Sequence, residues 1–60
     1  MYRYRLIDED GADLGPLISP RVTFAIGQDI VRRAEERYEI VRIVEPENES
    51  FHAYLVVRSR

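Results

Sequence analysis

Runs of β-branched and other apolar residues, rather than helical spacing, dominate the pattern of this chain. The strongest pattern covers Tyr38 to Val57, where the apolar runs Ile40–Val44 and Tyr54–Val57 are separated by the polar segment 45–50. β-Branched side chains favour the pleated surface of a strand, and proline and asparagine favour a turn. The segment therefore predicts a β-hairpin that forms the hydrophobic centre of the protein.

Alternation within this hairpin predicts which side chains face the core, because every second residue of a strand points to the same side. The two faces of the first strand carry Tyr38, Ile40, Arg42 and Val44 on one side, and Val41 and Ile43 on the other. Apolar groups on both faces predict a central strand that is covered on much of both sides. In the last strand, we expect a core face made of Phe51, Ala53, Leu55 and Val57.

The first twenty residues predict a second hairpin. Tyr2–Ile7 alternates apolar or aromatic residues with arginines, which is typical of a half-buried strand with its tyrosines inward. Asp10-Gly11 is a strong turn signal, because glycine accepts positive φ. Leu14–Ile18 returns as a second strand, and Pro16 indicates an edge strand because it has no N–H to donate. The C-terminal strand is the other candidate edge.

Residues 28–38 fit two structures. As a helix, Asp29 would be the N-cap, and an apolar stripe would run from Ile30 through Tyr38 to Val41. As strands, the segment would turn through Ala34–Glu36, and the strand-like context on both sides favours this interpretation. We therefore expect an all-β fold, a small SH3-like or open β-barrel of five to six short antiparallel strands. The alternative is an α+β fold, a four-stranded sheet with one helix at about 28–38.

Length and composition bound the fold to one small domain, residues 1–60. A chain of this size buries only about 60% of the surface that its unfolded form exposes, so little stability is available. Cysteine is absent, which removes disulfides and thiolate metal sites. The core must therefore be compact and apolar, or it must be completed by a partner.

Charge and hydropathy narrow the classes of partner. All nine basic residues are arginine, which is typical of a high-GC genome, and the formal net charge is −2. This balance disfavours a strongly basic nucleic-acid clamp. No stretch resembles a signal peptide or is long enough to span a bilayer, so we expect a cytoplasmic protein without a membrane partner.

Catalytic patterns are missing from the sequence. His52 is the only histidine, and no nucleophile is patterned around it. The acidic turn at 8–13 does not fit a calcium loop, because its glycine falls at the fourth position rather than the sixth. The three glycines do not form a phosphate-binding loop. We therefore expect a protein that is not an enzyme and has no cofactor, metal or evident small-molecule substrate.

The layout of the chain resembles a known kind of protein. It combines an opening strand, an acidic Asp-Gly turn, the run Asp13–Pro16, a Gly-Gln-Asp-Ile step at 27–30 and the closing run Ala53–Arg58. This is similar to small uncharacterised proteins common in high-GC bacteria, which have no activity to carry over. More generally, the pattern is similar to small SH3-like barrels, an analogy of fold alone.

Two functions are compatible with such a domain. The first is a protein-binding module, acting through self-association or a partner, because small sheets have exposed edges and faces. Its candidate contacts are Tyr54, Val56, His52 and Arg42. The alternative is weak binding of single-stranded nucleic acid through Tyr2, Arg3, Tyr4 and Arg5, since aromatic residues stack bases and arginine contacts phosphate. A variant of the first function is a subunit or inhibitor that docks through Asp8, Glu9, Asp10 and Asp13.

Overall fold

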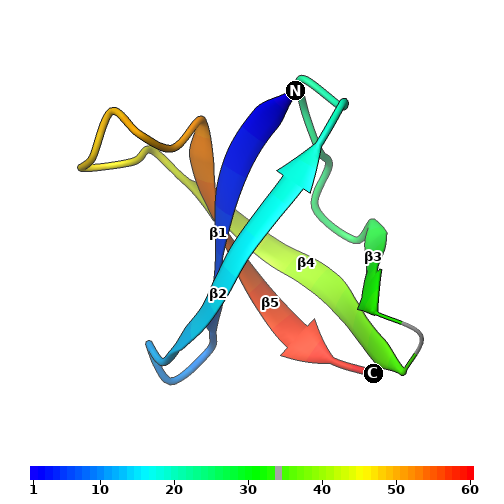
Figure 1. The fold of residues 1–60 in the computed structure, drawn as a ribbon. Helices are drawn as coiled ribbons and strands as arrows, with labels where there is room; N and C mark the ends of the chain where they lie inside the picture. Colours follow the sequence, from blue (N-terminus) through cyan, green and yellow to red (C-terminus); the bar gives the residue numbers. More distant parts are fainter. Residues whose placement is uncertain (34) are drawn as a thin grey trace.

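The computed structural model describes residues 1–33 and 35–60, and these form five strands and no helix. The strands are β1 (Tyr2–Asp8), β2 (Asp13–Ser19), β3 (Asp29–Arg33), β4 (Glu36–Val44) and β5 (Ala53–Ser59) (Figure 1). They make one curled sheet in the order β2-β1-β5-β4-β3. This confirms the all-β open barrel. In the described part of the chain, no helix is long and apolar enough to cross a membrane.

The helix alternative at 28–38 is wrong, because β3 and β4 pair as antiparallel strands across this segment. Ile30 lies opposite Tyr38, and Asp29 lies opposite Glu39. Ala34, in the predicted turn, lies outside the described residues. A longer β4 then pairs with β5, which confirms the hairpin expected from Tyr38 to Val57.

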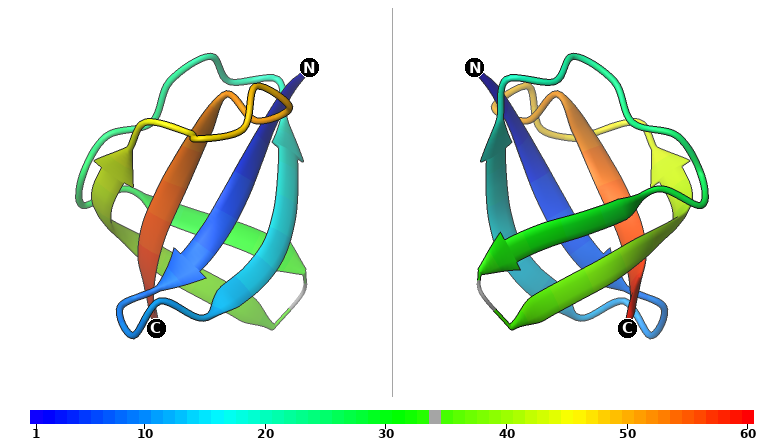
Figure 2. Two further views of the ribbon diagram at one scale, coloured as in Figure 1. Left: turned by 90° about the vertical axis from the view of Figure 1, so that its left-hand side faces the viewer. Right: turned by 90° about the vertical axis from the view of Figure 1, so that its right-hand side faces the viewer.

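One strand pair departs from the expected antiparallel arrangement. β1 and β5 run parallel, with Tyr4 opposite Ala53 and Leu6 opposite Leu55. The pairing places β5 between β1 and β4, so the C-terminal strand is central and its assignment as an edge is wrong. The edges of the sheet are β2, as Pro16 indicated, and β3. The chain is thus two antiparallel units joined along β1 and β5 (Figure 2).

The core lies inside the curl of the sheet and draws on four strands. Its buried residues are Tyr4, Leu6, Ile30, Ile40, Leu55 and Val57. Tyr4 is 1% exposed, and its hydroxyl donates a 2.6 Å hydrogen bond to the carbonyl of Arg21. The predicted inward tyrosine is therefore confirmed at Tyr4, whereas Tyr2, at the start of the strand, is 38% exposed.

A β-bulge in β4 corrects the faces predicted for that strand. Ile40 lies opposite Val57, but the register shifts before Arg42, so one extra residue is inserted at this point. An inserted residue reverses the side to which later side chains point. Ile43 consequently lies opposite the core residue Leu55, and Arg42 faces outward although Ile40 faces inward. The bulge explains why both predicted faces appeared apolar.

The predicted core position of Phe51 is also wrong. β5 begins at Ala53, so strand alternation does not extend back to Phe51. The phenylalanine ring lies instead against Tyr54 on the outer face of the sheet, with ring centroids 5.8 Å apart. Leu55 and Val57 are buried and Ala53 packs against them, as expected.

Arg32 connects the two edge strands at one end of the open side. Its Nη1 donates a hydrogen bond to the carbonyl of Leu14 in β2, and its Nε donates to Glu36 at 2.9 Å. Gly15 makes room for this contact, because a Cβ at that position would lie 3.2 Å from Arg32 Nη1. Gly15 also has a φ of +96°, which side chains rarely adopt. One side chain therefore bridges β2 and β3 at one end of the open side, where no strand ladder joins these two edges.

Candidate protein-contact surfaces

Three of the four residues suggested for partner contact share the outer face of the sheet. Leu55 and Val57 point into the core, so Tyr54 and Val56 of the same strand point outward. Arg42 lies opposite Val56 on β4. Val56 is only 9% exposed and offers little surface. The accessible part of the suggested set is therefore Tyr54 and Arg42.

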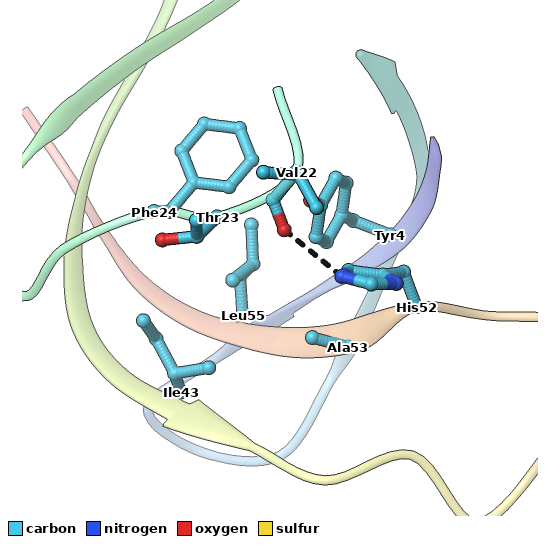
Figure 3. Close-up of a pocket in the computed structure, with 8 residues that line it drawn as sticks. All are labelled: Tyr4, Val22, Thr23, Phe24, Ile43, His52, Ala53 and Leu55. Atoms are coloured by element: carbon cyan, nitrogen blue, oxygen red, sulfur yellow. Dashed lines mark hydrogen bonds between the residues drawn. The ribbon is translucent and has the colours of Figure 1, made fainter. Parts of the chain in front are cut away.

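His52, the fourth residue, lies instead at the end of the barrel that is covered by the segment between β2 and β3. We call this end the mouth of the barrel. Its Nε2 is 2.9 Å from the carbonyl oxygen of Val22, and because a carbonyl only accepts, Nε2 carries the proton. Its ring packs on those of Tyr2 and Tyr4, with centroids 4.9 and 5.6 Å away. Figure 3 shows the imidazole directed at the segment between β2 and β3. His52 thus holds this connecting segment, residues 20–28, over the mouth.

A pocket of about 200 Å³ lies at this mouth, beneath the connecting segment (Figure 3). Phe24 packs edge-on against Tyr4, with centroids 4.9 Å apart. The polar ends of Tyr4 and His52 both bond to carbonyls of the connecting segment. Small-molecule sites are usually larger, about 300–1,000 Å³, and use such polar groups to orient a ligand. The contacts of Tyr4, Phe24 and His52 therefore attach the connecting segment to the barrel.

The four residues suggested for nucleic-acid contact do not form one surface. Tyr4 is buried with its hydroxyl occupied, so its ring is not accessible to a base. Tyr2 packs on His52 at the mouth of the barrel. Arg3 and Arg5 alternate with these tyrosines along β1 and point to the outer face. The arginines are therefore separated from the tyrosines that precede them in sequence.

The outer face instead places the two arginines with two other aromatic rings. We call Arg3, Arg5, Phe51 and Tyr54 the Arg–aromatic cluster. The guanidinium carbon of Arg5 lies 4.7 Å from the centroid of the Phe51 ring and 5.8 Å from that of Tyr54. Arg3 lies 5.2 Å from the same Phe51 centroid. Sequence reasoning missed Phe51 here, and the Arg5–Tyr54 contact depends on the parallel register of β1 and β5.

A groove on the open side of the barrel separates β2 from β3. Its volume is about 240 Å³, and we call it the open-side groove. The apolar residues that line it are Leu17, Ile18, Phe24, Ile30 and Val31. Ile18 and Val31 are 61% and 57% exposed, so both edge strands present an apolar side chain to solvent beside the groove. In Figure 2, β3 crosses the open side obliquely.

The backbone of β3 offers unpaired groups along this groove. The N–H of Ile40 in β4 donates to the carbonyl of Gln28 at 2.9 Å, which fixes the direction of the Gln28 carbonyl toward β4. Alternate residues of a strand turn their backbone groups to opposite sides. Asp29 and Val31 therefore direct their N–H and C=O groups away from β4, toward the groove.

The acidic turn that precedes β2 is ordered by its own backbone. The Asp8 carboxylate accepts hydrogen bonds from the N–H groups of Asp10 and Ala12, at 2.9 and 2.8 Å. Glu9 pairs with Arg58 at 3.2 Å. Within the described residues, no group of three or more aspartate, glutamate or histidine side chains is arranged to hold a metal ion. These contacts account for the turn as a structural element.

Comparison with known proteins gave no matching family model, no matching curated protein and no matching solved structure. The resemblance to small proteins of high-GC bacteria therefore stays a prediction.

Proposed function

We propose that this protein is a non-catalytic binding domain that takes an extended segment of a partner protein against β3. The observation that carries the proposal is the open-side groove, which combines the free backbone edge of β3 with a mixed lining. Its apolar residues lie beside the polar residues Ser19, Arg21, Gln28 and Asp29. An added strand gains main-chain hydrogen bonds for affinity and side-chain pockets for specificity.

The occupant is defined by the dimensions of the groove. Its edge at Asp29 and Val31 is short, and the Arg32 contact with Leu14 closes one end. A segment of about three residues can pair there, because a strand advances roughly 3.3 Å per residue. Its central side chain would enter the space above Leu17 and Ile30, which favours an aliphatic or aromatic residue. The partner segment is therefore short, extended and apolar at its centre.

Self-association through the same edge is the nearest competitor. A second copy would have to bring one of its own edge strands into the groove. Of its two edges, β2 contains Pro16, which has no N–H to donate to a ladder. Pairing through two β3 edges would have to bring two folded domains together along strands of only five residues each. A flexible segment of a partner protein meets neither obstacle, because it can supply a complete set of backbone N–H groups and can enter the groove without a second folded domain.

Selection from a displayed library of random heptapeptides tests the proposal. We expect enrichment of peptides with an apolar residue flanked by β-formers, and their affinity is then measured for two variants at one position. Val31→Pro removes an outward N–H on an edge strand, and Val31→Thr keeps that N–H and the β-branched shape. Peptide binding should weaken about tenfold in Val31→Pro, the equivalent of one lost hydrogen bond, and change little in Val31→Thr.

Circular dichroism and thermal unfolding establish that both variants are folded. If Val31→Pro does not fold, Ile18→Glu on the opposite wall of the groove replaces it, because Ile18 is exposed and contributes little to the core. Failure to enrich any peptide would overturn the proposal, as would equal affinity of the enriched peptides for wild type and the groove variants. Sedimentation to a dimer without peptide would favour self-association instead.

A further inference from the structure

We propose that the Arg–aromatic cluster is a second contact site, which binds an acidic segment of a protein. The site lies on the outer face of β1 and β5, away from the open-side groove, and the inference does not depend on the function proposed for that groove. It rests on the geometry of two arginine side chains and on the charges around them.

The aromatic rings favour defined positions of the two guanidinium groups. Both Arg3 and Arg5 lie over Phe51, and Arg5 also lies over Tyr54. A guanidinium over an aromatic ring is attracted by the ring quadrupole, and its planar N–H fork can still form paired hydrogen bonds with a carboxylate. Arginines held in this way lose less conformational entropy on binding than free side chains do.

The charge of the cluster is only partly neutralised. Arg5 Nε is 3.4 Å from Asp13 Oδ2, which leaves the terminal nitrogens of Arg5 available. Among the residues that the structure describes, no carboxylate lies within ion-pair distance of Arg3 or of Arg42, another arginine on this face. A ligand with several negative charges would complement this surface.

The covered ring faces favour an acidic peptide over a nucleic acid. Single-stranded nucleic acids bind small β-domains by stacking bases on accessible aromatic faces. Phe51 is covered by two guanidinium groups, and Tyr54 is approached by Arg5 and by the Phe51 ring. A base could stack only after displacing the arginines. Carboxylates require no such change, because they bind the exposed edges of the guanidinium groups.

Fluorescence anisotropy with a labelled hexaglutamate peptide at low ionic strength tests this site. Arg3→Gln is compared with Arg37→Gln, an exposed arginine on β4 outside the cluster, so that each variant loses one positive charge. We expect about tenfold weaker binding for Arg3→Gln, the effect of a lost charge-assisted hydrogen bond, and less than about twofold for Arg37→Gln. Phe51→Leu should also weaken binding, because it removes the ring that holds both guanidinium groups.

Asp13→Asn should change the affinity for the peptide in the opposite direction. In the wild type, Asp13 Oδ1 accepts a 2.8 Å hydrogen bond from the N–H of Gly15. The asparagine amide keeps an oxygen for this bond, but it carries no negative charge to compete with the peptide for Arg5. Tighter peptide binding is expected. The proposal is overturned by equal losses in Arg3→Gln and Arg37→Gln, by no binding of the peptide at high micromolar protein, or by tighter binding of a labelled oligothymidylate of equal charge than of the peptide.

Discussion

Tyr4 shows how one residue connects the core to the surface. Its ring lies among the buried residues of the barrel, and its hydroxyl reaches the backbone of the connecting segment at Arg21. Burial raises the pKa of Tyr4 above 10.0, and the neighbouring Tyr2 adds to this effect, whereas Arg21 acts against it. The folded protein therefore favours the neutral phenol.

This shift predicts a loss of stability in alkali that depends on Tyr4. Because the pKa is raised on folding, the stabilisation is fully present below pH 10 and is lost as the pH rises through the folded-state pKa. Tyr4→Phe should cost about 1 kcal/mol at pH 7, through the lost hydrogen bond, and should flatten the alkaline decline. Urea unfolding between pH 7 and pH 11 measures both effects.

Tyr54→Phe is the matched control for this experiment. It removes an outer-face hydroxyl and leaves Tyr4 intact, so the alkaline decline should persist. An unchanged decline in Tyr4→Phe would show that the buried phenol is not its source.

Individual residues also mark the limit of what sequence patterns could predict. Tyr4, Leu55 and Val57 were correctly expected in the core, because each lies inside a regular strand. Phe51 and His52 were assigned to the wrong sides, since β5 begins only at Ala53. The nucleic-acid hypothesis placed aromatic and cationic residues together by their closeness in sequence. In the fold, Arg5 instead contacts an aromatic ring on another strand.

Pairs of strands were predictable where the pairing is local. Both hairpins with sequence signals, β1–β2 and β4–β5, are present, because a turn and its flanking strands leave a continuous pattern. The parallel pairing of β1 with β5 leaves no such pattern, since the two strands are far apart in sequence. The β-bulge before Arg42 was equally hidden, and it reversed the predicted faces of half of β4.

The Arg32 side chain joins the edge strands β2 and β3, which do not pair through their backbones. Arg32→Gln should remove the contact with the Leu14 carbonyl and the ion pair with Glu36. A lost charge-assisted hydrogen bond costs about 1.5–3 kcal/mol, which is the decrease expected in the free energy of unfolding. Chemical denaturation measures it, with Arg37→Gln as a control for loss of surface charge.

The control variant should change stability by no more than about 0.5 kcal/mol, because Arg37 is exposed. Equal stability of Arg32→Gln and the wild type would mean that the contact between the edge strands contributes nothing to closure of the barrel.

The whole molecule depends on a small core. A 60-residue domain has a free energy of unfolding of only about 3–9 kcal/mol, from typical values per residue. Leu55 is 1% exposed in the central strand, and Leu→Ala at such a site costs about 2–5 kcal/mol. Leu55→Ala should therefore remove a large share of the free energy of unfolding, about 2–5 kcal/mol, measurable by urea unfolding followed by circular dichroism.

Val31→Ala is the corresponding control, because Val31 is 57% exposed and its truncation removes little buried surface. A fully folded Leu55→Ala variant with unchanged resistance to denaturant would contradict the assignment of the core.

At the scale of the whole molecule, the decisive feature is that the barrel remains open between its two edge strands. Residue-resolved amide hydrogen exchange, with and without a selected heptapeptide, tests the proposed use of this opening most directly. Exchange at the Asp29 and Val31 amides should be fast in the free protein and strongly slowed in the complex, because both N–H groups face the groove. Unchanged exchange at these two amides, with protection confined to the outer face of β1 and β5, would contradict the account.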